Sequence, residues 1–197
     1  ALTGIYLKLG TKTLYAGDLT YAYLDELAGL YSDYPGYNTN AVFNQSIVFD
    51  YENMFLSKKN GIYSAMYNVI ANINNFLEYV DKNKDVLVTE RYYETMKGEA
   101  LGLRAFLHFD LLRMFGPVYK EHPASKAIPY RTTFDKDATP VLSANEVVDA
   151  ILKDLNAAEK LLKESDPLHF FTDQMGEELT ETVSYTHLRA HETDQYL

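Results

Sequence analysis

The chain has 197 residues, no cysteine and a formal net charge of −10 at pH 7, from 28 acidic and 18 basic residues. The lack of cysteine excludes disulfide bonds and thiol chemistry within this segment. An acidic chain without basic clusters is a poor partner for phosphate backbones or anionic lipid, so no nucleic-acid partner is expected.

Two short helices and a loop are expected at the start of the chain. The first helix lies near residues 2–9 and the second near 18–31, where Asp18 is a good N-cap residue. Apolar side chains recur at helical spacing in the second helix: Leu19, Tyr23, Leu27 and Leu30. Residues 32–46 are rich in Ser, Asn, Pro and Gly, which predicts a loop.

A long amphipathic helix is predicted from about residue 47 to 80, with a break near Asn60 and Gly61 left open. One narrow arc carries its apolar side chains: Ile62, Met66, Ile70, Ile73, Leu77 and Val80. Asn74 lies at the edge of this arc. An asparagine there most often bonds the carbonyls of a neighbouring turn, so we interpret Asn74 as structural.

The helix predicted over residues 88–115 is apolar on almost every side, which is typical of a helix in the middle of a layered helical array. Small residues ahead of one ring form a flat strip on it: Gly98, Gly102, Ala105 and Phe109. Another helix can lie unusually close to such a strip. A narrow polar stripe also follows this helix: Lys97, Arg104 and His108. We interpret His108 as a packed, hydrogen-bonded core residue.

The last predicted helix follows a long irregular connection, from about residue 117 to 140. Ser143 and Glu146 have the spacing of a capping box and mark where this helix begins. Its expected buried stripe recurs every three or four residues: Val148, Ile151, Leu155, Ala158 and Leu162. Residues 164–183 are predicted to form a loop.

Several segments, taken in order, resemble the SusD/RagB family of nutrient-uptake lipoproteins of the outer membrane. They are YNVIANIN at 67–74, EALGLRAF at 99–106, FGPV at 115–118, AIPY at 127–130 and SANEVV at 143–148. Each motif alone is weak, but the ordered set is specific and covers roughly residues 1 to 165. Two features depart from the family: Tyr63 stands where a tryptophan is usual, and full-length members are far longer.

The resemblance implies an all-α fold of stacked tetratricopeptide-like helical hairpins with long irregular loops, incomplete at both ends. It also implies a protein that captures a glycan, oligosaccharide or other nutrient at the cell surface and delivers it to a TonB-dependent, SusC-like transporter in the outer membrane. An N-terminal lipid anchor upstream of Ala1 would be its only membrane contact. The alternative is a tetratricopeptide-like protein-interaction scaffold without glycan binding.

The two ends of the chain are expected to be incomplete or foreign. No initiator Met, signal peptide or lipidation cysteine is present, so residues 1–183 are interpreted as the N-terminal part of a SusD/RagB-like helical domain. Residues 184–197 resemble a translated sequencing adaptor and are interpreted as a non-native tail. His187 and His191 have metal-ligand spacing, but their place in this tail argues against a metal site.

No catalytic residue, metal or cofactor is predicted, because the sequence contains no HExxH, GxSxG, P-loop or GxGxxG pattern. The candidate ligand-binding residues lie instead in the first loop: Tyr31, Tyr34, Tyr37, Asn38 and Asn40. Tyrosine rings stack on the C–H faces of sugars, and phenol and amide groups bond hydroxyls. The alternative is that these tyrosines cap the helix ends beneath the loop, since tyrosine is abundant in this chain and commonly half-buried.

Overall fold

Three long helices form the body of the computed structural model: α4 (Met54–Lys82), α5 (Tyr92–Phe115) and α6 (Ala144–Ser165). The other elements are shorter: α1 (Leu2–Leu9), α2 (Tyr23–Leu27), the 3₁₀ turn η1 (Lys84–Val86), β1 (Lys126–Pro129) and β2 (Val141–Ser143). The structure describes residues 2–28, 30, 54–89 and 91–165. None of the helices in these ranges is long and apolar enough to span a membrane.

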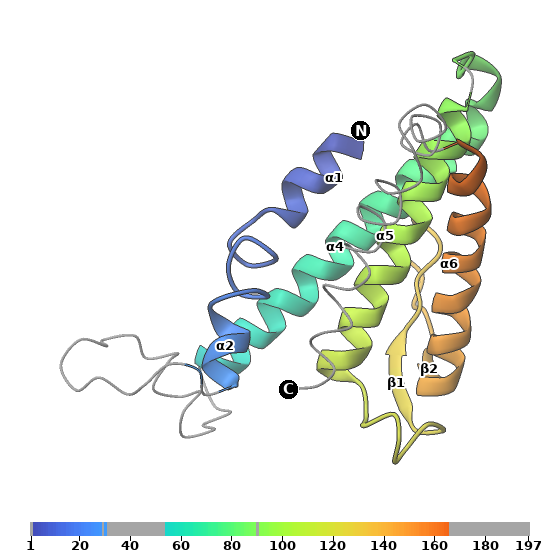
Figure 1. Cartoon of the computed structure of the whole chain (residues 1–197). Coiled ribbons are helices and arrows are strands. Elements are labelled where there is room, and N and C mark those ends of the chain that lie inside the picture. The colour runs from blue at the N-terminus through green and yellow to red at the C-terminus, as the bar shows by residue number, and fades with distance from the viewer. Residues whose placement is uncertain (1, 29, 31–53, 90, 166–197) are drawn as a thin grey trace, which may run out of the picture.

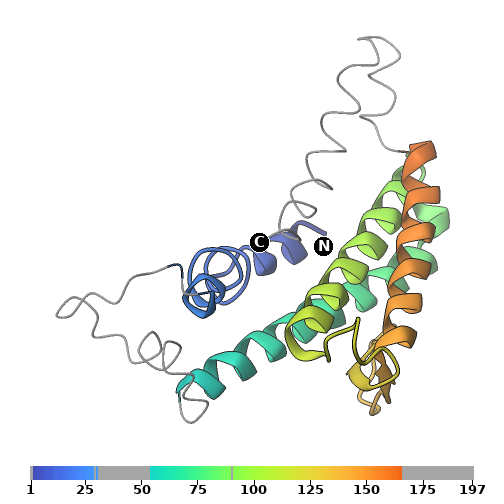
Figure 2. The ribbon, with the colours of Figure 1, turned by 60° about the horizontal axis from the view of Figure 1, so that its bottom comes forward.

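Successive long helices run antiparallel, and α5 lies between α4 and α6 (Figures 1 and 2). The short helix α1 lies beside α4. This arrangement of helical hairpins confirms the all-α prediction and the central place of α5.

The apolar arc predicted on α4 is the face that the structure buries. All six members of the arc are less than 10% exposed: Ile62, Met66, Ile70, Ile73, Leu77 and Val80. Burial of each such side chain contributes about 1.5–3 kcal/mol relative to an exposed position, which holds the helix to the core. The break considered near Asn60 and Gly61 is absent, because α4 continues through both residues.

The glycine strip on α5 lets α6 approach closely, as predicted. A Cβ atom added at Gly98 would lie 2.8 Å from Cγ of Leu162, and one at Gly102 would lie 3.9 Å from Cβ of Ala158. The helix begins at Tyr92, later than expected, because Arg91 has a left-handed φ of 64° that interrupts a right-handed helix.

The prediction of a helix over residues 18–31 is wrong for most of its length. Turns occupy residues 10–22, and only Tyr23–Leu27 is helical. Asp18 does not act as its cap; the buried carboxylate of Asp18 instead lies 2.8 Å from Nζ of Lys58 on α4. The exposed side chain of Leu30 is not part of a buried stripe.

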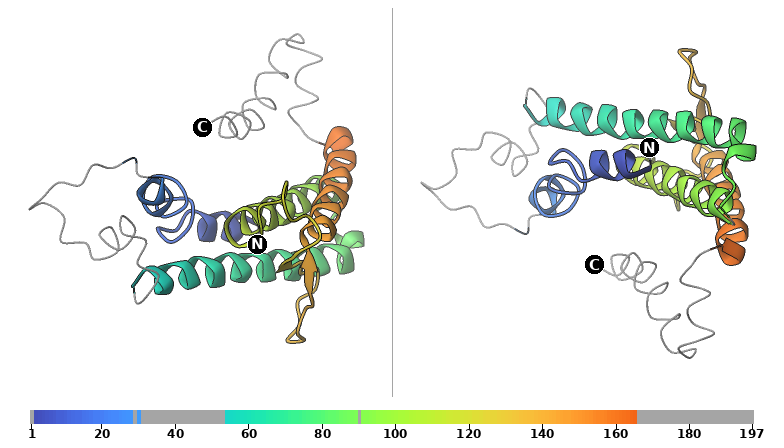
Figure 3. Two further views of the ribbon diagram at one scale, coloured as in Figure 1. Left: turned by 90° about the horizontal axis from the view of Figure 1, so that it is seen from below. Right: turned by 90° about the horizontal axis from the view of Figure 1, so that it is seen from above.

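The connection predicted to be irregular contains a short antiparallel hairpin. Lys126 pairs with Ser143 and Pro129 with Val141, with an irregularity between these pairs. Strands of three and four residues are too short to show a clear alternation, which is why the sequence does not reveal them. In Figure 3 the connection between the two strands crosses α4 and projects beyond it.

The start of α6 is the predicted capping box. The backbone N–H of Ser143 donates to Oε2 of Glu146 at 2.8 Å, and the backbone N–H of Glu146 donates to Oγ of Ser143 at 3.4 Å. The predicted buried stripe is partly wrong. Ile151 and Ala158 are buried, but Leu155 is 42% exposed and Asp154 takes the buried position beside it.

Candidate functional site

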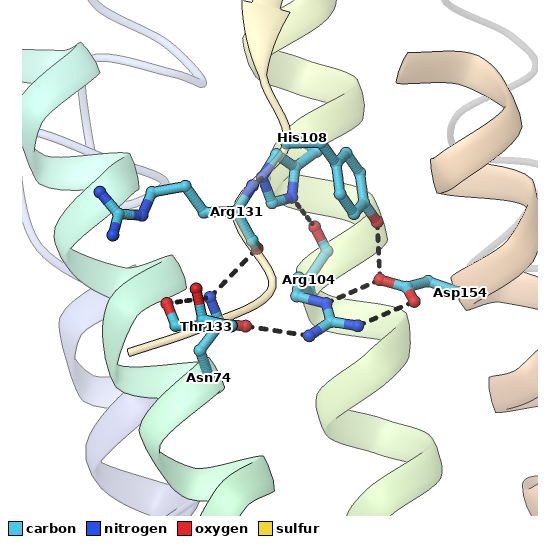
Figure 4. Close-up of polar contacts among 7 residues, drawn as sticks. Asn74, Arg104, His108, Arg131, Thr133 and Asp154 are labelled. Atoms are coloured by element: carbon cyan, nitrogen blue, oxygen red, sulfur yellow. Dashed lines mark hydrogen bonds and ion pairs between the residues drawn. The ribbon is translucent and has the colours of Figure 1, made fainter. Parts of the chain in front are cut away.

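A buried ion pair joins α5 to α6 at the middle of the helical layer. Nε of Arg104 donates to Oδ2 of Asp154 at 2.7 Å, and Nη2 donates to Oδ1 at 2.8 Å. The remaining guanidinium nitrogen, Nη1, donates to Oδ1 of Asn74 on α4 at 3.0 Å (Figure 4). A bidentate ion pair can offset the cost of burying two charges when the remaining donors and acceptors of both side chains are also hydrogen-bonded. Arg104 therefore ties three helices together.

The same group holds the chain that follows β1. Nδ2 of Asn74 donates to the carbonyls of Arg131 at 3.1 Å and Thr133 at 3.3 Å, and the phenol of Tyr130 donates to Oδ2 of Asp154 at 2.6 Å (Figure 4). The structural interpretation of Asn74 is confirmed. These bonds fix the backbone of residues 130–133 against α4 and α5.

His108 completes this buried group from α5. Its Nε2 accepts the backbone N–H of Arg131 at 3.1 Å, so Nδ1 carries the proton and donates to the carbonyl of Arg104 at 2.8 Å. The ring stacks on Tyr130 with centroids 3.9 Å apart. Burial lowers the pKa of His108 to about 4, and the charge of Arg104 adds to this effect. His108 is thus neutral, and the prediction of a packed, hydrogen-bonded core residue is confirmed.

Residues 129–135 form a wall shared by two surface clefts. The larger cleft, of about 550 Å³, lies between this wall and the facing sides of α4 and α5. Its charged lining residues come from three elements: Glu78, Asp81, Lys97, Arg104 and Asp135. Nζ of Lys97 lies 2.6 Å from Oδ1 of Asp81. Burial alone would raise the pKa of Asp81, but hydrogen bonds from Lys97 and Tyr93 outweigh it and hold that pKa below its usual range.

The second cleft, of about 370 Å³, lies between the same wall and α4, and aromatic rings supply much of its lining. Tyr63, Tyr67 and Phe134 line it together with polar groups that include Arg131 and Asp135. The phenol of Tyr67 donates to the carbonyl of Pro129 at 2.7 Å. This bond holds one end of the wall against α4. Burial raises the pKa of Tyr67, so this phenol stays protonated.

Tyr63 contributes to the core and to this cleft at once. Its ring centroid lies 4.7 Å from that of Tyr67 and 4.9 Å from that of Phe115, the latter in an edge-to-face contact. Such pairs stabilise beyond the area they bury. Tyr63 is therefore partly buried, packed against the core while it also lines the cleft.

The predicted ligand-binding residues, by contrast, lie outside the described ranges: Tyr31, Tyr34, Tyr37, Asn38 and Asn40. They remain predictions, as does the tail over residues 184–197. Sequence reasoning missed the cleft residues Arg131, Phe134 and Asp135, because they lie in the segment dismissed as irregular. Within the described ranges, no group of three or more His, Asp or Glu residues could hold a metal ion.

Comparison with known proteins decides the family. A sequence model of SusD-like proteins, described as starch-binding and associating with the outer membrane, matches residues 12–174. The chain belongs to this family. The match includes all three long helices and the hairpin, so the buried Arg104 group and both clefts lie within the family region.

Two relatives of this SusD-like chain show how far the similarity extends. SusD-like protein P38 of Formosa agariphila is 44% identical over 73 residues, which is 36% of this chain and 13% of that protein. The crystal structure of a SusD superfamily protein from Bacteroides thetaiotaomicron matches with a TM-score of 0.62 at 18% identity, over 81% of this chain and 35% of that chain. The second match shows a shared fold. The chain spans well under half the length of either relative.

Proposed function

We propose that this protein captures glycans at the outer membrane and releases them chemically unchanged to a TonB-dependent, SusC-like transporter. The observation that carries the proposal is the match of residues 12–174 to a family described as starch-binding and associating with the outer membrane. In the proposal the protein faces the outside of the cell and is held by an N-terminal lipid anchor.

The burial of three polar side chains, and their bonds within the protein, support binding over catalysis. Arg104, Asp154 and His108 are buried and bond to one another or to neighbouring backbone and side chains. A glycosidase needs two carboxylates held on either side of the scissile bond. Asp154, paired to Arg104 within the core, cannot serve as one of them without breaking the helical layer.

The loop residues predicted from the sequence are the first proposed contacts with the glycan: Tyr31, Tyr34, Tyr37, Asn38 and Asn40. Rings of this loop would stack on sugar faces while the amides bond hydroxyls. The loop precedes α4 in the chain, and α4 forms one side of both clefts.

Affinity electrophoresis tests the proposal. The whole protein should be retarded in gels that contain a polysaccharide it binds, and Tyr34→Ala or Tyr37→Ala should weaken the retardation. Reducing ends in the recovered polysaccharide should not increase. Unchanged mobility across a broad polysaccharide panel would overturn glycan capture and favour a protein-interaction scaffold; release of reducing ends would show an enzyme.

A further inference from the structure

We infer that the cleft formed by Tyr63, Tyr67 and the wall at residues 129–135 is a second contact site, which binds a short stretch of a neutral glycan. The inference rests on the proposed function and adds a site and a ligand class to it. The cleft volume of about 370 Å³ falls within the range of roughly 300–1,000 Å³ that is usual for small-molecule sites.

An exposed aromatic ring stands at this cleft. Phe134 lines it with 55% of its surface exposed, on the segment that crosses α4. A large exposed apolar side chain beside polar groups is the kind of surface on which the C–H face of a sugar ring stacks. Tyr63 and Tyr67 add aromatic surface from α4 on the other side.

The polar groups of the cleft suit hydroxyl groups. Nη2 of Arg131 donates to Oδ1 of Asp135 at 3.0 Å and to the backbone carbonyl of Asp135 at 2.9 Å. Both side chains stay partly exposed, with 25% and 39% of their surfaces accessible. The guanidinium offers further N–H donors and the carboxylate further acceptor sites. A sugar hydroxyl both donates and accepts, so it can bond to either group without breaking the pair.

Charge decides between neutral and anionic glycans. The Arg131–Asp135 pair is neutral as a unit, and the chain carries a formal net charge of −10. A uronic acid or sulfated sugar would meet the carboxylate of Asp135 and the overall negative field. A neutral glycan carries no charge, so neither the carboxylate nor the negative field repels it.

The wall of the cleft is held in place before any ligand arrives. His108 accepts the backbone N–H of Arg131, and Asn74 donates to the carbonyls of Arg131 and Thr133. Because these bonds fix the backbone beside Phe134 and Asp135, little ordering remains to be lost on binding.

Isothermal titration calorimetry of the whole protein tests this site. The neutral probes are an amylopectin-derived oligosaccharide and a xyloglucan oligosaccharide. Phe134→Ala should weaken binding roughly tenfold, the effect of losing one aromatic stacking contact. Tyr119→Ala serves as the matched control, since Tyr119 is 47% exposed and does not line this cleft. The control should bind as the unsubstituted protein does. Oligogalacturonate, an anionic probe, should bind at least tenfold more weakly than the better neutral probe.

Three results would overturn the inference, and they can be told apart. If the protein binds a probe but Phe134→Ala and Tyr119→Ala bind it equally well, this cleft is not a contact site, while glycan capture stands. Tighter binding of oligogalacturonate overturns the neutral class alone. No binding of any glycan by the unsubstituted protein overturns the proposed function together with this site. Circular dichroism of Phe134→Ala should match that of the control, because the substituted side chain is largely exposed.

Discussion

Arg104 shows at the scale of single residues how a charge can organise an apolar helix. Its guanidinium reaches α6 through Asp154 and α4 through Asn74, so one side chain fixes the positions of three helices. The neighbouring His108 secures the chain after β1 in the same way, but as a neutral group. A helix that is apolar elsewhere gains its register from these few directional bonds.

Removal of Arg104 should therefore destabilise the protein severely. Arg104→Met leaves the carboxylate of Asp154 buried without its ion partner, and we expect a loss of about 3–5 kcal/mol in the free energy of unfolding by urea. Asp154→Leu in the same protein should recover part of that loss, since no buried charge then remains. Lys82→Ala, which removes an exposed pair with Glu78, is the control and should have little effect, because solvent screens exposed ion pairs. A similar small loss for Arg104→Met would contradict the account.

His108 should make the protein less stable as the pH falls. The pKa of His108 is lowered from 6.5 to about 4 in the folded state, so the unfolded chain takes up a proton first. The stability is unaffected above pH 6.5 and decreases between pH 6.5 and 4, by about 3 kcal/mol in total.

A substitution that does not titrate isolates this effect. His108→Gln should be less stable than the unsubstituted protein at pH 7.5, but the difference between the two unfolding free energies should shrink as the pH approaches 4. Unfolding curves in urea at several pH values measure it. Parallel pH profiles for the two proteins would show that His108 is not buried in the neutral form.

At the scale of elements, two glycines of α5 face α6, and the distance to α6 differs between them. Gly98 lies against Leu162 with no room for a methyl group, whereas Gly102 has ordinary contact distance to Ala158. Both are helical positions, where alanine is intrinsically favoured over glycine by roughly 1 kcal/mol. Packing and helix propensity thus oppose each other at one position only.

The matched pair Gly98→Ala and Gly102→Ala tests this close approach. Gly98→Ala should destabilise the protein by about 1–3 kcal/mol, because its methyl group forces Leu162 or the helix to shift. Gly102→Ala should leave the free energy of unfolding unchanged or raise it by up to about 1 kcal/mol. Thermal or urea unfolding separates the two variants; equal stability would mean that α6 does not lie on the strip.

The same elements show what the sequence reveals and what it does not. The arc from Ile62 to Val80 and the strip at Gly98 were predictable because helical spacing records burial directly. Asp154 was missed because a buried carboxylate is recognised only with its partner, and Arg104 lies 50 residues away along the chain. The hairpin was missed because its strands are too short to show an alternating pattern, and the contacts of β1 with α5 and α6 leave no local signal in the sequence. The cleft at Phe134 depends on that hairpin.

At the scale of the whole molecule, the helical layer is a support and the connections carry the proposed function. α4, α5 and α6 fix one another through apolar packing and the Arg104 group. The segment after β1 is bound to that support and forms a wall of both clefts. The loop at residues 31–40 precedes α4 and supplies the other predicted contacts. In the proposed function, this SusD-like chain holds a glycan between aromatic rings and does not cleave it.

The retardation of the whole protein by a neutral polysaccharide, with the chain length of that polysaccharide measured afterwards, tests this account most directly. We expect slower migration in gels containing such a polysaccharide, little effect of polygalacturonate, and a polysaccharide of unaltered length. Migration that no polysaccharide slows, or a polysaccharide that emerges shortened, would contradict capture without cleavage.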